Sequence, residues 1–213
     1  MSSSPALFFL FFSHPPANSL SLLLSFYLDL SSYGQKFCDD INGEWGSYPY
    51  EDLMLGLDHI ISSYSYVDGN RVAALGASYG GWMMNWFNGN TNRFRCLVNH
   101  CGLSDTAGMY FATEELFFPE YDFRGTPWES DLYEKWNPIN LVTNWKTPTL
   151  VIHGGKDYRV VDGQGFTTFT ALQRQGIKSR LLYFPDENHW VLRPANSLRW
   201  HEEVLAWITA NTL

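Results

Sequence analysis

The sequence predicts an α/β fold in which a mostly parallel sheet carries helices on both faces. From residue 51 to the C-terminus, short apolar runs typical of buried strands alternate with stretches that have the apolar spacing of a helix. This alternation favours strand–helix–strand units over separate helical and strand regions. A length of 213 residues is enough for one domain with a substantial core.

The first part of the pattern holds two helices and two strands. Residues 51–63 carry leucine and isoleucine on one helix face, four and seven positions apart. Residues 71–75 form an apolar run that ends before a glycine, as expected of a buried strand. Residues 78–87 are expected to be helical, and residues 94–98 to form the next strand.

The second part repeats the alternation. Residues 148–153 read PTLVIH and residues 179–184 read SRLLYF, and both segments are predicted strands. Between them, residues 165–175 are predicted to form a helix that a glycine ends. Residues 197–210 are predicted to form a final amphipathic helix with Ser197 at its N-cap.

Two segments do not follow this pattern. Residues 1–32 contain no basic residue and hold two apolar stretches split by Ser-His-Pro-Pro. Neither stretch is long enough to span a membrane, and a secretory signal has a positive start and one continuous apolar core. We expect residues 1–32 to be an atypical leader outside the fold, with an imperfect signal peptide as the alternative, and residues 33–213 to be the folded domain. Residues 103–146 are rich in aromatic side chains and proline, without a clear period.

The composition excludes some classes of function. The net charge is −8, from 14 basic and 22 acidic residues, and we find no basic run. Nucleic-acid binding depends mainly on Lys and Arg, so we expect no nucleic-acid partner. Cys38, Cys96 and Cys101 form neither a CxxC pair nor a cluster with metal-ligand spacing, so we expect no metal and no cofactor.

A G-x-S-x-G motif lies between a predicted strand and a predicted helix. Its residues run from Gly76 to Gly80, with Ser78 at the centre. In this motif the serine occupies a strained turn, and glycines are needed because the turn leaves no room for neighbouring side chains. The hydroxyl is thereby exposed near a helix N-terminus, which favours developing negative charge. Ser78 is therefore the predicted nucleophile of a serine hydrolase.

A serine hydroxyl needs a base, and the base needs an orienting acid. In the order typical of this motif, the acid and then the histidine follow the serine on loops after later strands. Asp157 follows the strand 148–153, and His189 follows the strand 179–184. Parallel strands bring such loops to one edge of the sheet. We predict that His189 takes the Ser78 proton, that Asp157 orients His189, and that the Tyr79 backbone N–H stabilises the oxyanion.

Other residues compete for the roles of acid and base. Asp162 is expected to cap a helix near Gly163, and Asp186 to shape the turn before the predicted base. His153 ends a strand and is expected to pack under the Asp157 loop, whereas His100 could line the cleft but precedes the acid. The remaining histidines are expected on surface helices or in the leader, and they are His14, His59 and His201.

Three segments together resemble the prolyl oligopeptidase family of serine peptidases, and within it the fungal dipeptidyl-peptidases. They read GASYGGWM around Ser78, TPTLVIHGGKDYRV around Asp157 and PDENHW around His189. The similarity begins near Tyr33 and runs to the C-terminus. It implies a partial α/β-hydrolase fold whose early strands are missing, together with the release of N-terminal dipeptides from peptide substrates.

The resemblance also implies an N-terminal β-propeller, which we expect to be absent from this chain, and secretion of the fungal members. Trp82 lies where a substrate side-chain pocket is expected, although core packing is an alternative role. Two rival functions remain: an esterase or lipase with the same catalytic residues, or a truncated fragment without activity. A dipeptidyl amide and a short-chain ester distinguish the two enzymes.

Overall fold

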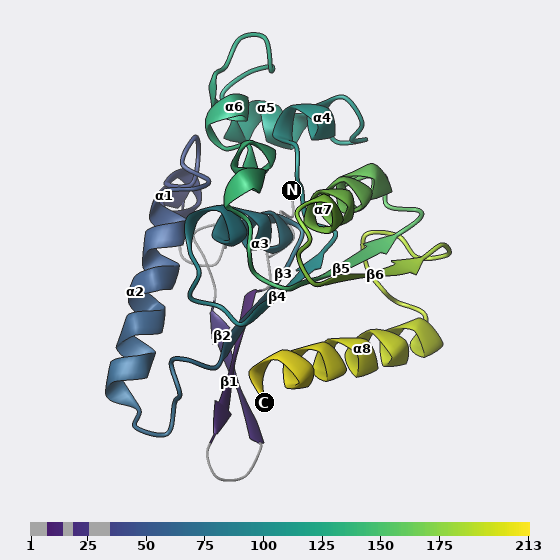
Figure 1. The fold of residues 1–213 in the computed structure, drawn as a ribbon. Coiled ribbons are helices and arrows are strands. Elements are labelled where there is room, and N and C mark those ends of the chain that lie inside the picture. The colour runs from purple at the N-terminus through teal and green to yellow at the C-terminus, as the bar shows by residue number, and fades with distance from the viewer. Residues whose placement is uncertain (1–7, 15–18, 26–34) are drawn as a thin grey trace.

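A computed structural model describes residues 8–14, 19–25 and 35–213 of the chain (Figure 1). Six strands form one sheet in the order β2-β1-β3-β4-β5-β6. The strands are β1 (Phe8–His14), β2 (Ser19–Ser25), β3 (Val72–Ala77), β4 (Cys96–His100), β5 (Thr149–Gly154) and β6 (Ser179–Phe184). The helices are α1 (Gln35–Asp39), α2 (Tyr48–Ser63), α3 (Tyr79–Asn90), α4 (Thr106–Tyr110), α5 (Phe117–Asp122), α6 (Leu132–Lys135), η2 (Pro138–Asn144, a 3-10 helix), α7 (Asp162–Arg174) and α8 (Pro194–Thr212).

Strands β3 to β6 run parallel, as the sequence predicts. His100 pairs with Ala77 of β3 on one side and with Ile152 of β5 on the other. Gly154 and Phe184 pair at the ends of β5 and β6. The carboxyl ends of these strands therefore meet at one edge, where the loops that follow them open. All four predicted strands are confirmed.

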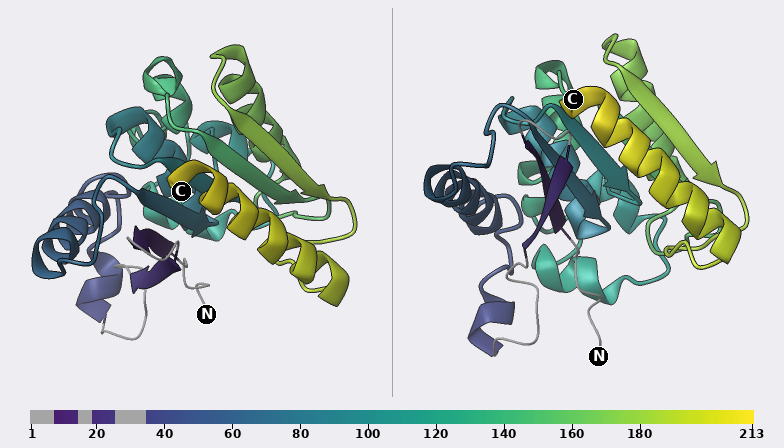
Figure 2. Two further views of the ribbon diagram at one scale, coloured as in Figure 1. Left: turned by 60° about the horizontal axis from the view of Figure 1, so that its bottom comes forward. Right: turned by 90° about the horizontal axis from the view of Figure 1, so that it is seen from below.

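Helices cover both faces of the sheet, as Figures 1 and 2 show. On one face, Val204, Trp207 and Ile208 of α8 pack against β3, β4 and β5. On the opposite face, α3 packs on the sheet through Phe87, and α7 packs on β5 through Leu172. The predicted architecture is therefore confirmed, because the apolar runs of the central strands are buried on both sides.

The structure also places two strands within residues 1–32. Strand β1 pairs antiparallel with β2 and with β3, with Phe8 opposite Gly76 and Phe12 opposite Val72. This differs from the expectation that the whole segment lies outside the fold. An unpaired edge strand exposes N–H and C=O groups, and a hairpin of two apolar runs can satisfy them along β3. The boundary at residue 32 stays a prediction.

Helices α7 and α8 begin earlier than the sequence predicts. Helix α8 has Arg193 at its N-cap and begins at Pro194, so the prediction of Ser197 as the N-cap is wrong. Proline is favoured in the first helical turn because no backbone N–H is needed there. Helix α7 has Val161 at its N-cap, so Asp162 begins the helix and does not cap it.

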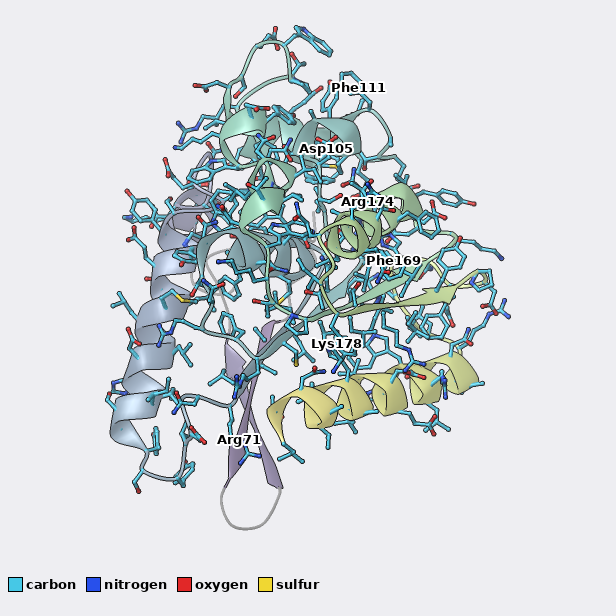
Figure 3. All side chains as sticks on the ribbon, in the orientation of Figure 1. Arg71, Asp105, Phe111, Phe169, Arg174 and Lys178 are labelled. Carbon is cyan, nitrogen blue, oxygen red and sulfur yellow. The ribbon has the colours of Figure 1, made fainter. Side chains whose placement is uncertain are left out.

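The aromatic segment 103–146 follows the carboxyl end of β4 and forms the short helices α4, α5, α6 and η2. Figure 3 shows Asp105 and Phe111 at the upper end of the molecule, where α4 lies. Asp105 is the residue before α4, and the Phe111 ring after it is exposed. Among the described residues, no helix has the length and apolar character needed to cross a membrane.

Candidate active site

Ser78 lies on the sharp turn between β3 and α3. Its backbone has φ 59° and ψ −117°. This left-handed conformation is unfavourable for any residue that has a side chain. The turn is attached to the end of the neighbouring strand β4, because the Ser78 N–H donates to the His100 carbonyl at 3.0 Å. The residue before the turn belongs to a buried strand and the residue after it begins a helix. This arrangement matches the strand–turn–helix context predicted for the nucleophile.

Gly76 of the motif and Gly81, directly after the motif, allow close approach of backbone to backbone. A Cβ added at Gly76 would lie 2.1 Å from the Gly80 carbonyl oxygen. A Cβ added at Gly81 would lie 2.6 Å from the Gly102 Cα, in the segment after β4. Both distances are far shorter than any real contact of a Cβ atom, and the obstructing atoms are backbone. The requirement for glycine at these positions is therefore steric.

Asp157 lies on the loop after β5 and is fixed by its own loop. Its Oδ1 accepts hydrogen bonds from the backbone N–H groups of Arg159, at 3.1 Å, and Val160, at 2.9 Å. The carboxylate is fully buried. These bonds leave Oδ2 to accept from the imidazole of His189, whose Nδ1 lies 2.7 Å away. The structure thus brings the predicted acid and the predicted base into direct contact.

The acid and base loops are also joined through their backbones. The Lys156 N–H donates to the Glu187 carbonyl at 2.8 Å. A Cβ added at Gly154 would lie 2.2 Å from the Asn188 carbonyl oxygen. Only glycine therefore lets the His189 loop approach the end of β5 this closely. This close approach keeps the Asp157 and His189 loops side by side.

Glu187 is a site residue that sequence reasoning missed. Its buried carboxylate accepts from the backbone N–H groups of Leu192 and Arg193, both at 3.0 Å, and from the Asn196 amide at 2.8 Å. Burial alone would raise the pKa of Glu187, but these hydrogen bonds outweigh it and lower the pKa. The ionised side chain therefore ties the His189 loop to the start of α8.

Cys101 is the second residue that sequence reasoning missed, and it connects the nucleophile to the base. Its Sγ lies 4.0 Å from His189 Nε2 and 3.7 Å from the His189 carbonyl oxygen. Its backbone has φ 43°, and the side chain is buried. Burial first, and then the nearby Asp157 charge, raise the pKa of the Cys101 thiol well above its usual value. A hydrogen bond with the Ser78 backbone acts in the opposite direction and places the thiol beside the nucleophile turn.

Ser78 Oγ and the His189 ring are not joined by a hydrogen bond among the described contacts. Hydrogen bonds between a nucleophile and its base are often long without substrate and shorten when substrate binds. Ser78, Cys101 and His189 nevertheless lie together, because Ser78 follows β3, Cys101 follows the neighbouring β4, and His189 Nε2 contacts the Cys101 sulfur.

The two buried histidines near the site are unsuited to act as the base. Burial, followed by the proximity of His189, lowers the pKa of His100 to about 3. His153 donates from Nε2 to the Val160 carbonyl at 2.7 Å, and burial lowers its pKa as well. Gly165 of α7 packs against the His153 ring. The bond to Val160 shows that His153 packs under the Asp157 loop, as predicted.

The rival acids have other partners. Asp162 accepts a hydrogen bond from the Tyr183 hydroxyl at 2.8 Å. Asp186 forms an ion pair with Arg193, with 2.7 Å between Nη1 and Oδ2. The Asp186 contact lies at the start of α8, so this residue contributes to the turn before His189, as the sequence suggests.

The remaining predicted site residues begin helix α3. Tyr79 directly follows Ser78, so its backbone N–H lies at the positive end of the helix dipole, and its hydroxyl donates to the Trp45 carbonyl at 2.6 Å. Trp82 is completely buried and donates from Nε1 to the Trp136 carbonyl at 3.1 Å. The structure therefore places Trp82 in the core instead of in a substrate pocket, because the indole stacks on Tyr79 and Trp86 and has no exposed surface.

Three potential metal ligands lie together at this site. One ligand atom each from Cys101, Asp157 and His189 lies within 4.8 Å of the others, and all three residues are buried. Spacing along the sequence does not reveal this group, because its members follow three different strands. Cys96 is buried and free, like Cys101, while the Cys38 side chain lies outside the described residues.

A serine on a strained strand-to-helix turn, with an acid and a histidine on later loops of the same edge, defines an α/β-hydrolase domain. A sequence profile described as the prolyl oligopeptidase family matches residues 30–212. The chain therefore belongs to the prolyl oligopeptidase family.

Sequence similarity to individual proteins supports this assignment. The chain is similar to dipeptidyl-peptidase 5 of Schizosaccharomyces pombe, with 52% identity over 181 residues, which cover 84% of this chain and 26% of the relative. It is also similar to dipeptidyl-peptidase 5 of Trichophyton schoenleinii, with 44% identity over 183 residues, 84% of this chain and 25% of the relative. The chain thus spans about a quarter of the length of these relatives.

Solved structures share the fold. Acylaminoacyl peptidase of Pyrococcus horikoshii superposes with a TM-score of 0.85 at 20% identity, over 92% of this chain and 33% of that one. A puromycin-hydrolyzing peptidase of Mycobacterium tuberculosis gives a TM-score of 0.84 at 22% identity, over 92% of this chain and 30% of that one. At this level of identity the likeness supports the fold alone.

Proposed function

We propose that this chain carries the catalytic residues of a serine peptidase that releases N-terminal dipeptides. Ser78 is the nucleophile, His189 its general base and Asp157 the group that orients the base. The observation that carries the proposal is the 2.7 Å contact between His189 Nδ1 and Asp157 Oδ2, at the sheet edge where Ser78 occupies a strained turn.

The geometry supports a two-stage acyl transfer. Ser78 Oγ attacks the scissile carbonyl carbon while His189 Nε2 takes its proton, which forms a tetrahedral oxyanion beside the start of α3. The Tyr79 backbone N–H stabilises that oxyanion, and His189 then returns the proton to the leaving amine. Water completes the cycle by the same proton transfers, which releases the dipeptide and restores Ser78.

Hydrogen bonding at Nδ1 fixes the chemistry of the imidazole. Because Nδ1–H donates to Asp157, the neutral ring presents the unprotonated Nε2 to the serine. Asp157 then stabilises the imidazolium as it forms, without taking the proton itself. The buried carboxylate and its two backbone donors keep this orientation in the absence of substrate.

Labelling with a fluorophosphonate tests the nucleophile. We expect soluble, folded chain to take up one label on Ser78, found by peptide mass analysis, and the Ser78→Ala variant to take up none. Folded chain that does not react would contradict the proposal and favour the fragment without activity.

Substrate choice separates the peptidase from an esterase. The named relatives are dipeptidyl-peptidases, and this supports a dipeptidyl substrate for the whole protein. We expect a dipeptidyl amide of a chromogenic amine to be cleaved in a Ser78-dependent manner, and its N-acetylated form to be cleaved much more slowly. Hydrolysis of a short-chain ester alone would favour the esterase.

We further propose that the whole protein acts outside the cell. The support is its similarity to the fungal members of the family, as the sequence resemblance implies. Expression of the full gene with a C-terminal tag, followed by comparison of medium and cell extract, tests this location. Retention of all tagged protein in the cells would contradict it.

A further inference from the structure

The contact between Cys101 and His189 has a geometry that the peptidase mechanism does not use. Cys101 Sγ lies 4.0 Å from Nε2, the same nitrogen that must receive the serine proton. The other ring nitrogen, Nδ1, is bonded to the Asp157 carboxylate. The Cys101 sulfur, a soft metal ligand, therefore lies next to His189 Nε2, a borderline ligand and the atom proposed to act as the base.

We propose that Cys101 Sγ and His189 Nε2 form a binding site for a thiophilic divalent cation of the Zn²⁺ or Cd²⁺ class, and that occupation of this site inhibits the enzyme. The inhibitory consequence rests on the proposed function, whereas the metal site itself does not.

The distance between the two atoms fits such an ion. With Zn–S at about 2.3 Å and Zn–N at about 2.0–2.1 Å, tetrahedral bonding separates sulfur from nitrogen by about 3.6 Å. The 4.0 Å found here exceeds that value by only a few tenths of an ångström, within the reach of a small side-chain rotation. On binding, the thiol releases its proton to solvent, and the neutral imidazole binds through the Nε2 lone pair.

Asp157 gives the imidazole the surroundings typical of a metal ligand. A histidine that binds a metal through one nitrogen usually donates its other N–H to a carboxylate, which fixes the ring and makes it more basic. Asp157 Oδ2 accepts from Nδ1 at 2.7 Å, and Oδ1 is held by two backbone N–H groups. The catalytic pair therefore also supplies the orienting group that metal binding needs.

The position of the thiol is held by the fold. Cys101 has a positive φ, and its backbone N–H donates to the Ile152 carbonyl at 2.8 Å. Together these features aim the side chain from the end of β4 toward the His189 loop. Cys96, in contrast, begins β4 and packs among apolar residues against α8, which makes it a matched control.

Cadmium absorption tests the metal site without any use of enzyme activity. Thiolate bonding to Cd²⁺ produces an ultraviolet charge-transfer band. In full chain carrying Cys38→Ser, which removes one other thiol, we expect titration with Cd²⁺ to saturate this band at one ion per chain. The band should be lost in Cys101→Ala and kept in Cys96→Ala. In His189→Gln, Cd²⁺ affinity should fall at least about tenfold, since loss even of an outer partner weakens metal binding by that much.

Zinc sensitivity tests the consequence. We expect Zn²⁺ to slow fluorophosphonate labelling of Ser78, a chelator to restore the rate, and Cys101→Ala to be at least about tenfold less sensitive to Zn²⁺. A cadmium band that persists in Cys101→Ala, or equal zinc sensitivity of the Cys101→Ala and Cys96→Ala variants, would overturn the proposal. If Ser78 takes up no label at all, the proposed function fails, and the cadmium band still decides the metal site.

Discussion

Ser78 combines an unfavourable backbone conformation with the reactive group of the proposed site. Its φ of 59° and ψ of −117° fall in a region populated almost only by glycine. The surrounding glycines allow the turn, but the residue at its centre must carry a hydroxyl. We therefore interpret the strain at this position as a requirement of the chemistry.

Substitution of Ser78 by glycine and by alanine separates strain from reactivity. Both variants lose the hydroxyl, so both should lose fluorophosphonate labelling. Glycine accepts the left-handed conformation, so Ser78→Gly should be about 1 kcal/mol more stable than Ser78→Ala in urea unfolding. Equal or reversed stabilities would show that the turn is not strained by the Cβ atom.

Replacement of Asp157 should greatly lower the turnover rate, although it leaves the serine hydroxyl itself in place. The Asp157→Asn variant keeps the size of the side chain but favours the wrong imidazole tautomer, so the turnover rate should fall by on the order of 10⁴. Asp162→Asn is the matched control, because Asp162 bonds to Tyr183 and not to His189. Steady-state rates on the dipeptidyl amide measure both. A rate loss confined to Asp162→Asn would reassign the acid.

At the scale of the elements, the central strands could be predicted because each is a local apolar run, whereas the hairpin of β1 and β2 could not. Its position depends on pairing with the open edge of β3, a contact between segments about sixty residues apart. The position of Ser78, Asp157 and His189 at one edge of the sheet was predictable because each follows a recognisable strand, and their catalytic roles stay a prediction. Cys101 and Glu187 were not, because only the folded structure shows that the Cys101 thiol lies beside His189 and that the buried Glu187 carboxylate bonds to the start of α8.

Close approach of the His189 loop to the end of β5 depends on one glycine. Gly154→Ala would place a Cβ within 2.2 Å of the Asn188 carbonyl oxygen, so the backbone must move. We expect a loss of about 2 kcal/mol or more in unfolding free energy, together with slower labelling of Ser78.

Gly56 in α2 provides the comparison. A Cβ added there meets nothing within 4 Å, and the residue lies inside a helix, so Gly56→Ala should stabilise the chain by about 0.5–1 kcal/mol. Chemical denaturation of both variants checks the pair. Similar effects from the two substitutions would show that this close approach is not tightly packed.

At the scale of the whole molecule, the buried His100 makes folding sensitive to acid. Its pKa is lowered to about 3 in the folded chain, against an ordinary value near 6.5 in the unfolded chain. Between these two values the unfolded chain binds the extra proton, so stability is fully present above pH 6.5 and falls as the pH drops toward 3. Between pH 6.5 and 4.5 this residue should remove about 2–3 kcal/mol.

Urea unfolding at several pH values measures that loss. The His100→Gln variant should show a shallower decrease of stability between pH 6.5 and 4.5 than the unaltered chain. His201→Gln, at an exposed position of α8, serves as the control and should leave the decrease as it is. An unchanged slope in His100→Gln would mean that other groups cause the acid sensitivity.

The backbone bond between the two loops that carry the acid and the base has a consequence for motion. Lys156 and Gly155 lie in a surface loop, yet their amides donate to Glu187 and Phe184. Their hydrogens should therefore exchange with solvent as slowly as those of the neighbouring strands, and only when both loops open together. In thermal motion the two loops would then move together. The contact between Asp157 and His189 would be kept, while the distance from His189 to Ser78 changes.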